Sequence, residues 1–276
     1  MTVLDPTRFT AKTILGMSRE MELAMGLTPA NTTQYSLNHK YGVEASTVPS
    51  QGTKLAYFGI GIGGCRNIDD GNLSEPNVVR LTNMDLYTPV PIRMVAVEED
   101  LTDSERALYR MRRLEEHSGQ IYACYYLKLI DLDTVTVQYT QVNPDTGAES
   151  PYTLNNSNLN PTPPIPDSSG NITDESRNIN VFVNTRLVFT GAELSEYIGV
   201  VHGGDTRYAR ISEIGLYLGR DQTVAGTQIN NVSGNYTESL MTVLHTHATM
   251  NGYDLASPTA SITHTVVLGK SDIILV

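Results

Sequence analysis

The amino-acid sequence predicts a mainly β protein with a β-sandwich-like core, one clear α-helix, an extended N-terminal arm and a long insertion. Three observations predict this fold. Short runs rich in Val, Ile and Tyr recur along the 276 residues with turn residues between them, as in the strands of a sandwich. Apolar residues are 40% and charged residues 18% of the chain, and both shares are somewhat below those of an average globular protein. Asn, Thr, Ser and Gly, which are common in turns and β loops, make up the difference. No internal repeat of fixed period is visible, so a solenoid or a propeller is not expected.

Residues 1–53 are expected to form the N-terminal arm with one short helix. Apolar side chains lie at helical spacing in residues 14–27, which favours an amphipathic helix there. Residues 28–53 are polar and interrupted by Pro and Gly, and they have few apolar side chains to pack on one another. Such a segment gains its stability from a neighbour, either in its own chain or in another subunit.

The β core is predicted to comprise residues 54–142 and 179–276. In the first part, residues 120–132 and 134–142 indicate consecutive strands of a hairpin with a short turn between them. The other strand candidates are residues 54–64, 78–81, 90–97, 180–189, 209–218, 240–250, 261–268 and 273–276.

The clear helix is predicted over residues 103–117. Thr102 and Glu105 form a capping box, in which each side chain bonds to the backbone of the other residue. Apolar side chains follow on one helical face, and Gly119 is the natural end of the helix.

Residues 143–178 predict a long loop or insertion outside the core. Prolines recur there among Asn, Ser, Thr and Gly, so the segment offers few apolar side chains for burial. We expect either a mobile surface loop or an ordered extension that contacts a partner.

One glycine-rich string matches a known fingerprint. Gly59-x-Gly61-x-x-Gly64 has the spacing of a dinucleotide-binding loop, but that site needs a following helix N-terminus to hold the pyrophosphate. Turn residues follow here instead, so we expect the glycines to let another backbone approach a strand. Residues 67–72 are oxygen-rich like the start of a calcium loop, but they lack the closing Glu, and a turn is expected.

Two histidines stand on one face of a predicted strand. His245 and His247 are expected to be solvated or interface residues on an outward face. A metal site is the alternative, and it would need a third ligand, for which His264 and Asp254 are the nearest candidates.

The sequence shows no catalytic constellation, so we expect no enzyme and no cofactor. The acids of residues 98–100 and 115–116 are explained by the two ends of the predicted helix. A net charge of −11 argues against direct nucleic-acid recognition, because a phosphate backbone requires a basic surface. No apolar run is long enough for membrane insertion. Cys65 and Cys124 are predicted to be reduced thiols.

Surface aromatic residues are the remaining signal for function. Tyr buries ring area while its hydroxyl keeps a hydrogen-bond partner, and it is therefore frequent at interfaces. Tyr122, Tyr125 and Tyr126 fall on both faces of the predicted strand at residues 120–132, and a strand that is apolar on both faces must be covered twice. These three residues are candidate subunit-interface residues.

Residues 210–221 (RISEIGLYLGRD) resemble a strand–turn phrase of tail, baseplate and tail-fibre-associated proteins of tailed bacteriophages. We call these residues the phage-like phrase, and Arg210 and Tyr217 within it complete the candidate interface. Three further segments are similar to uncharacterised virion proteins of phages: residues 88–95 (TPVPIRMV), 100–113 (DLTDSERALYRMRR) and 121–131 (IYACYYLKLID).

The resemblance implies a structural subunit of the virion, made in the host cytoplasm. The expected partners are copies of the chain itself in a symmetric ring at the neck, collar or tail end, together with portal, connector, tail or baseplate proteins. The alternative is a carbohydrate- or receptor-binding β protein associated with a baseplate or fibre.

Overall fold

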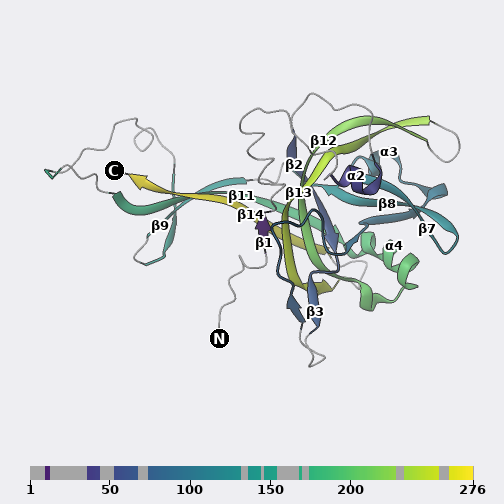
Figure 1. The fold of residues 1–276 in the computed structure, drawn as a ribbon, viewed down its shortest axis with the longest axis horizontal. Helices are drawn as coiled ribbons and strands as arrows, with labels where there is room; N and C mark the ends of the chain where they lie inside the picture. The colour runs from purple at the N-terminus through teal and green to yellow at the C-terminus, as the bar shows by residue number, and fades with distance from the viewer. Residues whose placement is uncertain are drawn as a thin grey trace. The chain divides into compact units, whose positions relative to one another are not determined.

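The computed structural model divides the chain into two compact units, which we describe one at a time (Figure 1). The larger unit comprises Met1–Ile130 and Val188–Ile262, and the smaller unit comprises Asp131–Leu187 and Thr263–Val276. The fold is mainly β, as predicted. The structure describes residues 10–12, 36–43, 53–67, 74–131, 136–143, 146–153, 168–169, 174–227, 233–254 and 261–275.

The strands are β1 (Thr10–Lys12), β2 (Lys54–Gly61), β3 (Cys65–Asn67), β4 (Ser74–Pro76), β5 (Pro89–Val90), β6 (Arg93–Ala96), β7 (Tyr109–His117), β8 (Gln120–Leu129), β9 (Thr136–Val142), β10 (Glu149–Pro151), β11 (Asp174–Thr190), β12 (Arg210–Thr227), β13 (Ser233–Asp254) and β14 (Ser261–Leu275). The helices are α2 (Leu37–Tyr41), α3 (Asp103–Arg106) and α4 (Gly191–His202), with 3-10 turns η2 (Val97–Glu99) and η4 (Thr206–Tyr208).

One antiparallel sheet forms most of the larger unit. Its strand order is β1-β13-β12-β2-β8-β6; β7 also pairs with β8, and β5 with β2. The long β12–β13 hairpin runs from Arg210 opposite Asp254 to Thr227 opposite Ser233. The buried side chains at the centre are Leu37, Ala56, Tyr57, Met111, Leu127, Tyr217 and Leu244.

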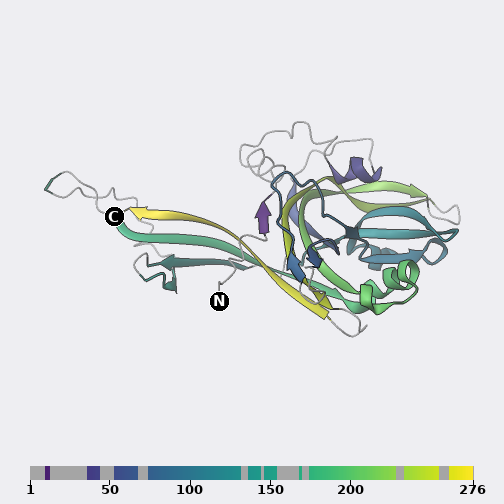
Figure 2. The ribbon, with the colours of Figure 1, turned by 60° about the horizontal axis from the view of Figure 1, so that its bottom comes forward.

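The large sheet curls until two strands that are not paired, β13 and β7, come into contact (Figure 2). The carboxylate of Glu238 in β13 joins them, because it accepts the backbone N–H of Met111 at 2.6 Å and that of Arg112 at 3.0 Å. Met111 adopts a left-handed φ of 57°. The sandwich-like core therefore consists of one sheet folded over itself, with buried side chains between its halves.

The prediction of a helix over residues 103–117 is wrong in its length. The capping box of Thr102 and Glu105 is present, but α3 ends at Arg106 and β7 begins at Tyr109. Ser118 and Gly119 have φ values of 52° and 83°, as in a two-residue type I′ turn, and they join β7 to β8. Pairing along this hairpin outweighs the local helical pattern.

The N-terminal region is held in part by its own chain. β1 pairs with β13, and α2 places Asn38 against a bulge of β13. The Asn38 side chain donates to the carbonyl of Ser239 at 2.6 Å and accepts from the N–H of Thr242 at 2.9 Å. The predicted helix at residues 14–27 lies outside the described residues.

The best-formed helix, α4, was missed at the sequence level. Thr190 and Glu193 form its capping box, and Gly203 ends it in a left-handed conformation. Leu194 and Ile198 are buried, and the helix contacts β6. The capping pattern Thr190-x-x-Glu193 was a readable signal for this helix.

The smaller unit contains a four-stranded sheet in the order β10-β9-β11-β14. The predicted hairpin of residues 120–132 and 134–142 is wrong, because β8 pairs with β7, β6 and β2, whereas β9 pairs with β10 and β11. The predicted insertion at 143–178 contains β10 and the start of β11. The smaller unit therefore includes residues 131–142, 179–187 and 263–276, which were expected in the core, together with the predicted insertion.

Candidate functional site

The phage-like phrase contributes a fully buried carboxylate. Glu213 of β12 has no exposed surface and accepts four hydrogen bonds. Three come from backbone N–H groups, those of Gly63 at 2.6 Å, Tyr87 at 2.7 Å and Thr88 at 3.0 Å. The fourth joins its Oε2 to Nε2 of His247 in β13 at 2.9 Å. We call these five residues the Glu213 cluster.

The glycine-rich string forms the wall of this cluster. A Cβ atom added to Gly61 or Gly63 would lie 2.8 Å from Oε1 of Glu213, too close for any side chain. The string therefore lets a neighbouring backbone approach, as expected, and a carboxylate as well. The residues that follow it directly, Cys65–Asn67, form the strand β3, where a dinucleotide-binding loop would have a helix N-terminus. Its first glycine, Gly59, packs against the backbone of Tyr126 instead.

His247 is buried, which contradicts the prediction of an outward face. Its Nδ1 lies 3.0 Å from the side-chain nitrogen of Asn83, and its ring packs on that of Tyr87 at a centroid distance of 5.0 Å. With Asn83 donating to Nδ1, the ring carries its proton on Nε2 and donates it to Glu213. His245 is also buried, and its Nδ1 bonds to the hydroxyl of Thr246 at 2.7 Å.

Two opposing effects set the charge of Glu213. Burial alone would raise the pKa of this carboxyl, but the hydrogen bonds from the His247 ring and from the backbone of Tyr87 and Thr88 outweigh it and lower the pKa below its usual range. Glu213 is therefore an ionised acceptor at neutral pH. Its oxygens are occupied by donors of the fold, so its role is to hold segments together.

The cluster holds residues 77–88, which we call the 77–88 loop. Asn77 bonds to the backbone of Gly63 and Gly64, each at 2.7 Å, and Asn83, Tyr87 and Thr88 bond within the cluster. Although the backbone is fixed, four apolar side chains of the loop face solvent: Val78, Leu81, Met84 and Tyr87.

A second buried acid fixes the same loop from its other side. Asp85 accepts the hydroxyls of Tyr41 at 2.9 Å and Tyr217 at 3.1 Å, and it pairs with Lys40. The Tyr217 hydroxyl is fully buried, and burial together with the Asp85 charge raises its pKa well above the usual value. The loop is therefore anchored to α2 and to β12 as well as to the cluster.

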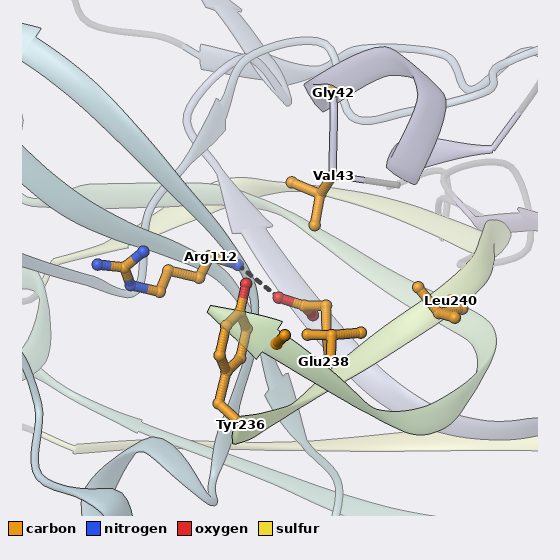
Figure 3. Close-up of a pocket in the computed structure, with 8 residues that line it drawn as sticks. Gly42, Val43, Arg112, Tyr236, Glu238 and Leu240 are labelled. Atoms are coloured by element: carbon orange, nitrogen blue, oxygen red, sulfur yellow. Dashed lines mark hydrogen bonds between the residues drawn. The ribbon is translucent and has the colours of Figure 1, made fainter. Parts of the chain in front are cut away.

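A small hollow of about 200 Å³ opens beside the β12–β13 ribbon (Figure 3). In Figure 3 the backbone of Arg112 bonds to Glu238, and the guanidinium of Arg112 points away, where it pairs with Asp100 at 2.7 Å. Burial raises the pKa of Glu238 although three backbone N–H groups oppose the shift. The residues that line the hollow are Gly42, Val43, Arg112, Val224, Ala225, Tyr236, Glu238 and Leu240.

The chemistry of this hollow is limited by hydrogen bonds already made. The oxygens of Glu238 accept from the backbone N–H groups of Met111, Arg112 and Ser239. The guanidinium of Arg112 forms an ion pair with Asp100. Acid–base catalysis requires a group within hydrogen-bond reach of a substrate proton, and these groups are engaged by the fold. The engaged carboxylate of Glu238 joins β13 to β7 beside the hollow.

The predicted interface tyrosines differ in burial. Tyr125 and Tyr217 are buried in their own chain, so they are not surface residues and that prediction is wrong. Tyr126 is half-buried, stacks on Tyr41 with ring centroids 5.0 Å apart and donates to Glu115 at 2.6 Å.

The remaining candidates are more accessible. Tyr122 is half-buried, and its hydroxyl donates to Gln120 at 3.0 Å. Arg210 is exposed and donates to the carbonyl of Asn251. Both faces of the middle of β8 are covered by the same chain, because Tyr125 is buried and contacts Tyr109, and Tyr126 stacks on Tyr41, whereas Ile121 near the start of the strand is exposed.

No group of three His, Cys, Asp or Glu side chains within the part of the chain that the structure describes could hold a metal ion. Cys65 and Cys124 are thiols, and burial raises the pKa of Cys124 to about 12. Among the described helices none is long and apolar enough to cross a membrane.

Sequence reasoning missed the acids that organise the fold. Asp85 and Glu238 gave no signal in the sequence, and Glu193 was readable only as a helix cap, because their other partners lie far away along the chain. Glu193, for example, accepts from Tyr109 at 2.5 Å and from Lys128 at 2.7 Å.

The comparisons with known proteins give one match. No curated protein and no solved structure matches the chain. The model of a Family of unknown function (DUF7208) matches residues 2–276. Since this match covers nearly the whole sequence, the chain belongs to this family of unknown function, DUF7208.

Proposed function

We propose that the chain is a structural subunit of a tailed-phage virion that assembles with copies of itself into a ring. The observation that carries the proposal is the role of the phage-like phrase in the fold. Glu213, the second residue of its Ser-Glu-Ile-Gly-Leu-Tyr core, anchors the 77–88 loop, whose apolar side chains face solvent. The part that resembles phage proteins thus supports an exposed apolar surface, as a subunit contact requires.

The distribution of charged side chains supports the role of a rigid structural subunit. Buried and half-buried acids bond to donors from distant parts of the chain, which makes a stiff frame. Glu196, for example, accepts from the side chain of Arg93 and from the backbone N–H of Met94. The net charge of −11 opposes close contact between free copies, so assembly is favoured where another virion protein supplies a template. The neck, collar or tail end of the virion is the proposed place.

The experiment is a search for the chain in purified particles. Virions of the phage that encodes the chain are purified on a density gradient, the copy number per particle is measured by quantitative mass spectrometry, and antibody-labelled particles are imaged. Several copies per particle, labelled at one point of the neck or tail, support the proposal. Absence from particles overturns it.

A second measurement addresses the carbohydrate-binding alternative. The full-length chain is tested on a glycan array and by gel filtration. Specific glycan binding by a monomer would replace the proposed function with receptor recognition.

A further inference from the structure

Two exposed apolar groups lie at different edges of the larger unit. The first is on the 77–88 loop, which follows β3 and β4, and the second is at the turn end of the β7–β8 hairpin. β3 lies at the lower edge of the larger unit and β7 extends to its right edge in Figure 1. A copy that used one group to contact a neighbour would keep the other group free for the next neighbour.

The loop patch consists of Val78, Leu81, Met84 and Tyr87, with Arg80 among them. Val78 is 71% and Leu81 55% exposed, and the hydroxyl of Tyr87 donates to the carbonyl of Val78 at 2.7 Å. Arg80 is exposed and makes no ion pair with any described residue. The other acidic or basic residue of the loop, Asp85, is buried against Lys40. The exposed charge of the loop patch is therefore positive.

The hairpin patch consists of Leu114, Ile121 and Glu116. Glu116 and Ile121 are cross-strand partners, so their side chains share a face, and Leu114 lies two residues before Glu116 on that face. Leu114 is 50% and Ile121 48% exposed. Glu116 is exposed and has no ion-pair partner among the residues the structure describes. The exposed charge of the hairpin patch is therefore negative.

The two patches match in character and are opposite in charge. Each presents apolar side chains that lose contact with water on docking, and each has one unpaired charge of the sign that the other needs. We propose that the loop patch of one copy docks on the hairpin patch of the next copy, with Arg80 facing Glu116. The contact is head to tail, so it leads to a closed ring when the rotation between copies permits. This inference rests on the proposed self-assembly and names its surface.

The backbone under each patch is already in place. The Glu213 cluster and Asp85 fix the loop, and ladder hydrogen bonds between Tyr109 and His117 on one side and Gln120 and Lys128 on the other fix the hairpin. Docking therefore orders only a few side chains, which reduces its entropic cost. The patches are small, so we expect a weak contact between free copies that a template strengthens.

The test measures self-association of the full-length chain by sedimentation velocity over a concentration series. Leu81→Asp and Ile121→Asp are each expected to raise the dissociation constant at least about tenfold, because each places a charge in an apolar contact. Leu108→Asp is the matched control. Leu108 is 51% exposed, lies at the open end of the hairpin and belongs to neither patch, so its variant should associate like the natural chain. Circular dichroism checks that all variants fold.

Charge reversal tests the pairing itself. Arg80→Glu and Glu116→Arg should each weaken association, whereas the double variant R80E/E116R and an equimolar mixture of the two single variants should both restore it. Restoration in the mixture requires contact between residue 80 of one copy and residue 116 of another, and growth beyond a dimer in sedimentation velocity shows that this contact is head to tail. Association of L81D and I121D like that of the natural chain, no recovery in the mixture, or a natural chain that stays monomeric at about 1 mM would overturn the inference.

The failures of the two proposals can be told apart. If the chain is present in virions and L81D is incorporated normally, the virion role stands and the docking surface is wrong. If the chain is absent from virions but the charge-reversal mixture recovers association, the docking surface stands and the virion role is wrong.

Discussion

Gly64 lies so close to Ser212 that a Cβ atom added to the glycine would stand 1.8 Å from the Ser212 carbonyl oxygen. The N–H of Gly64 also donates to Oγ of Ser212 at 2.9 Å. These contacts join the glycine-rich segment after β2 to the phage-like phrase of β12. The two sequence features are thus the two sides of one packed structure, which leads to a sharp comparison of glycine substitutions.

Gly64→Ala should destabilise the chain by more than about 3 kcal/mol, because the backbone atoms it meets cannot move aside. Gly199→Ala is the control. Gly199 lies in α4 with nothing within 4 Å of an added Cβ, and alanine should stabilise that helix by up to about 1 kcal/mol. Urea unfolding measures both, and equal effects would contradict the packing described.

Glu213→Gln should cost about 3–5 kcal/mol of the free energy of unfolding. The amide would point N–H groups at backbone N–H donors and would remove the charge that those donors stabilise. Glu116→Gln removes a carboxylate from the exposed hairpin end and should change stability little. A Glu213→Gln variant as stable as the natural chain would show that the four hydrogen bonds contribute no net stability.

Stability should fall in acid through carboxylates such as Asp221. Burial raises the pKa of Asp221, but the hydrogen bond and charge of Arg110 and the hydroxyl of Tyr57 outweigh it and hold the pKa below its usual range. A depressed pKa in the folded state contributes stability that is complete above the unfolded value of about 3.9 and is lost as the pH falls through the folded value. The gap in unfolding free energy between the natural chain and Asp221→Asn should therefore be constant from pH 5 to 7. It should shrink below about pH 4, and a gap that is the same at pH 3 and pH 6 would contradict this assignment.

The turn between β7 and β8 should respond in opposite directions to two substitutions. Ser118→Asn creates the favoured Asn-Gly pair and should stabilise by about 0.5 kcal/mol. Gly119→Ala places a side chain at a φ of 83° and should cost about 1–2 kcal/mol. If residues 103–117 were helical, Gly119→Ala would still destabilise, because a glycine that ends a helix also has a positive φ, but Ser118→Asn would create no Asn-Gly hairpin turn and would not stabilise. The sign of the Ser118→Asn effect in urea unfolding therefore distinguishes hairpin from helix.

Cys124 should resist alkylation in the native chain. Its thiol is buried, and burial raises its pKa to about 12, so almost no thiolate is present at pH 8. Cys65 is half-buried and should react first with iodoacetamide, while both should react in denaturant. Peptide mass spectrometry reports each site, and rapid native labelling of Cys124 would show that β8 opens easily.

The sequence was informative where local chemistry decides structure. The capping box at Thr102 and Glu105 starts a helix as predicted, and the β character of residues 210–218 is seen in β12. The length of that first helix was wrong because the partner of β7 is a strand beyond the turn at Ser118, and cross-strand pairing decided the outcome. The Ser118-Gly119 pair was itself a turn signal.

The candidate site was harder to predict because its parts are distant in sequence. Glu213 bonds to Gly63 across 150 residues and to Tyr87 across 126, and no periodicity reveals such a contact. His247 was expected on an outward face because a strand pattern gives two faces without saying which is covered. The loop from residue 77 to 88 covers it here.

Asn38 fills the bulge of β13 with hydrogen bonds to residues 201 and 204 positions later in the chain. During translation these bonds can form only after residue 242 has been made, about 200 residues after α2. Contacts of such long sequence separation slow folding, since loop-closure entropy is lost before the contacts are gained. A nascent chain that lacks β13 therefore leaves Leu37 and its neighbours uncovered, and chaperones that bind apolar segments would meet the chain at that stage.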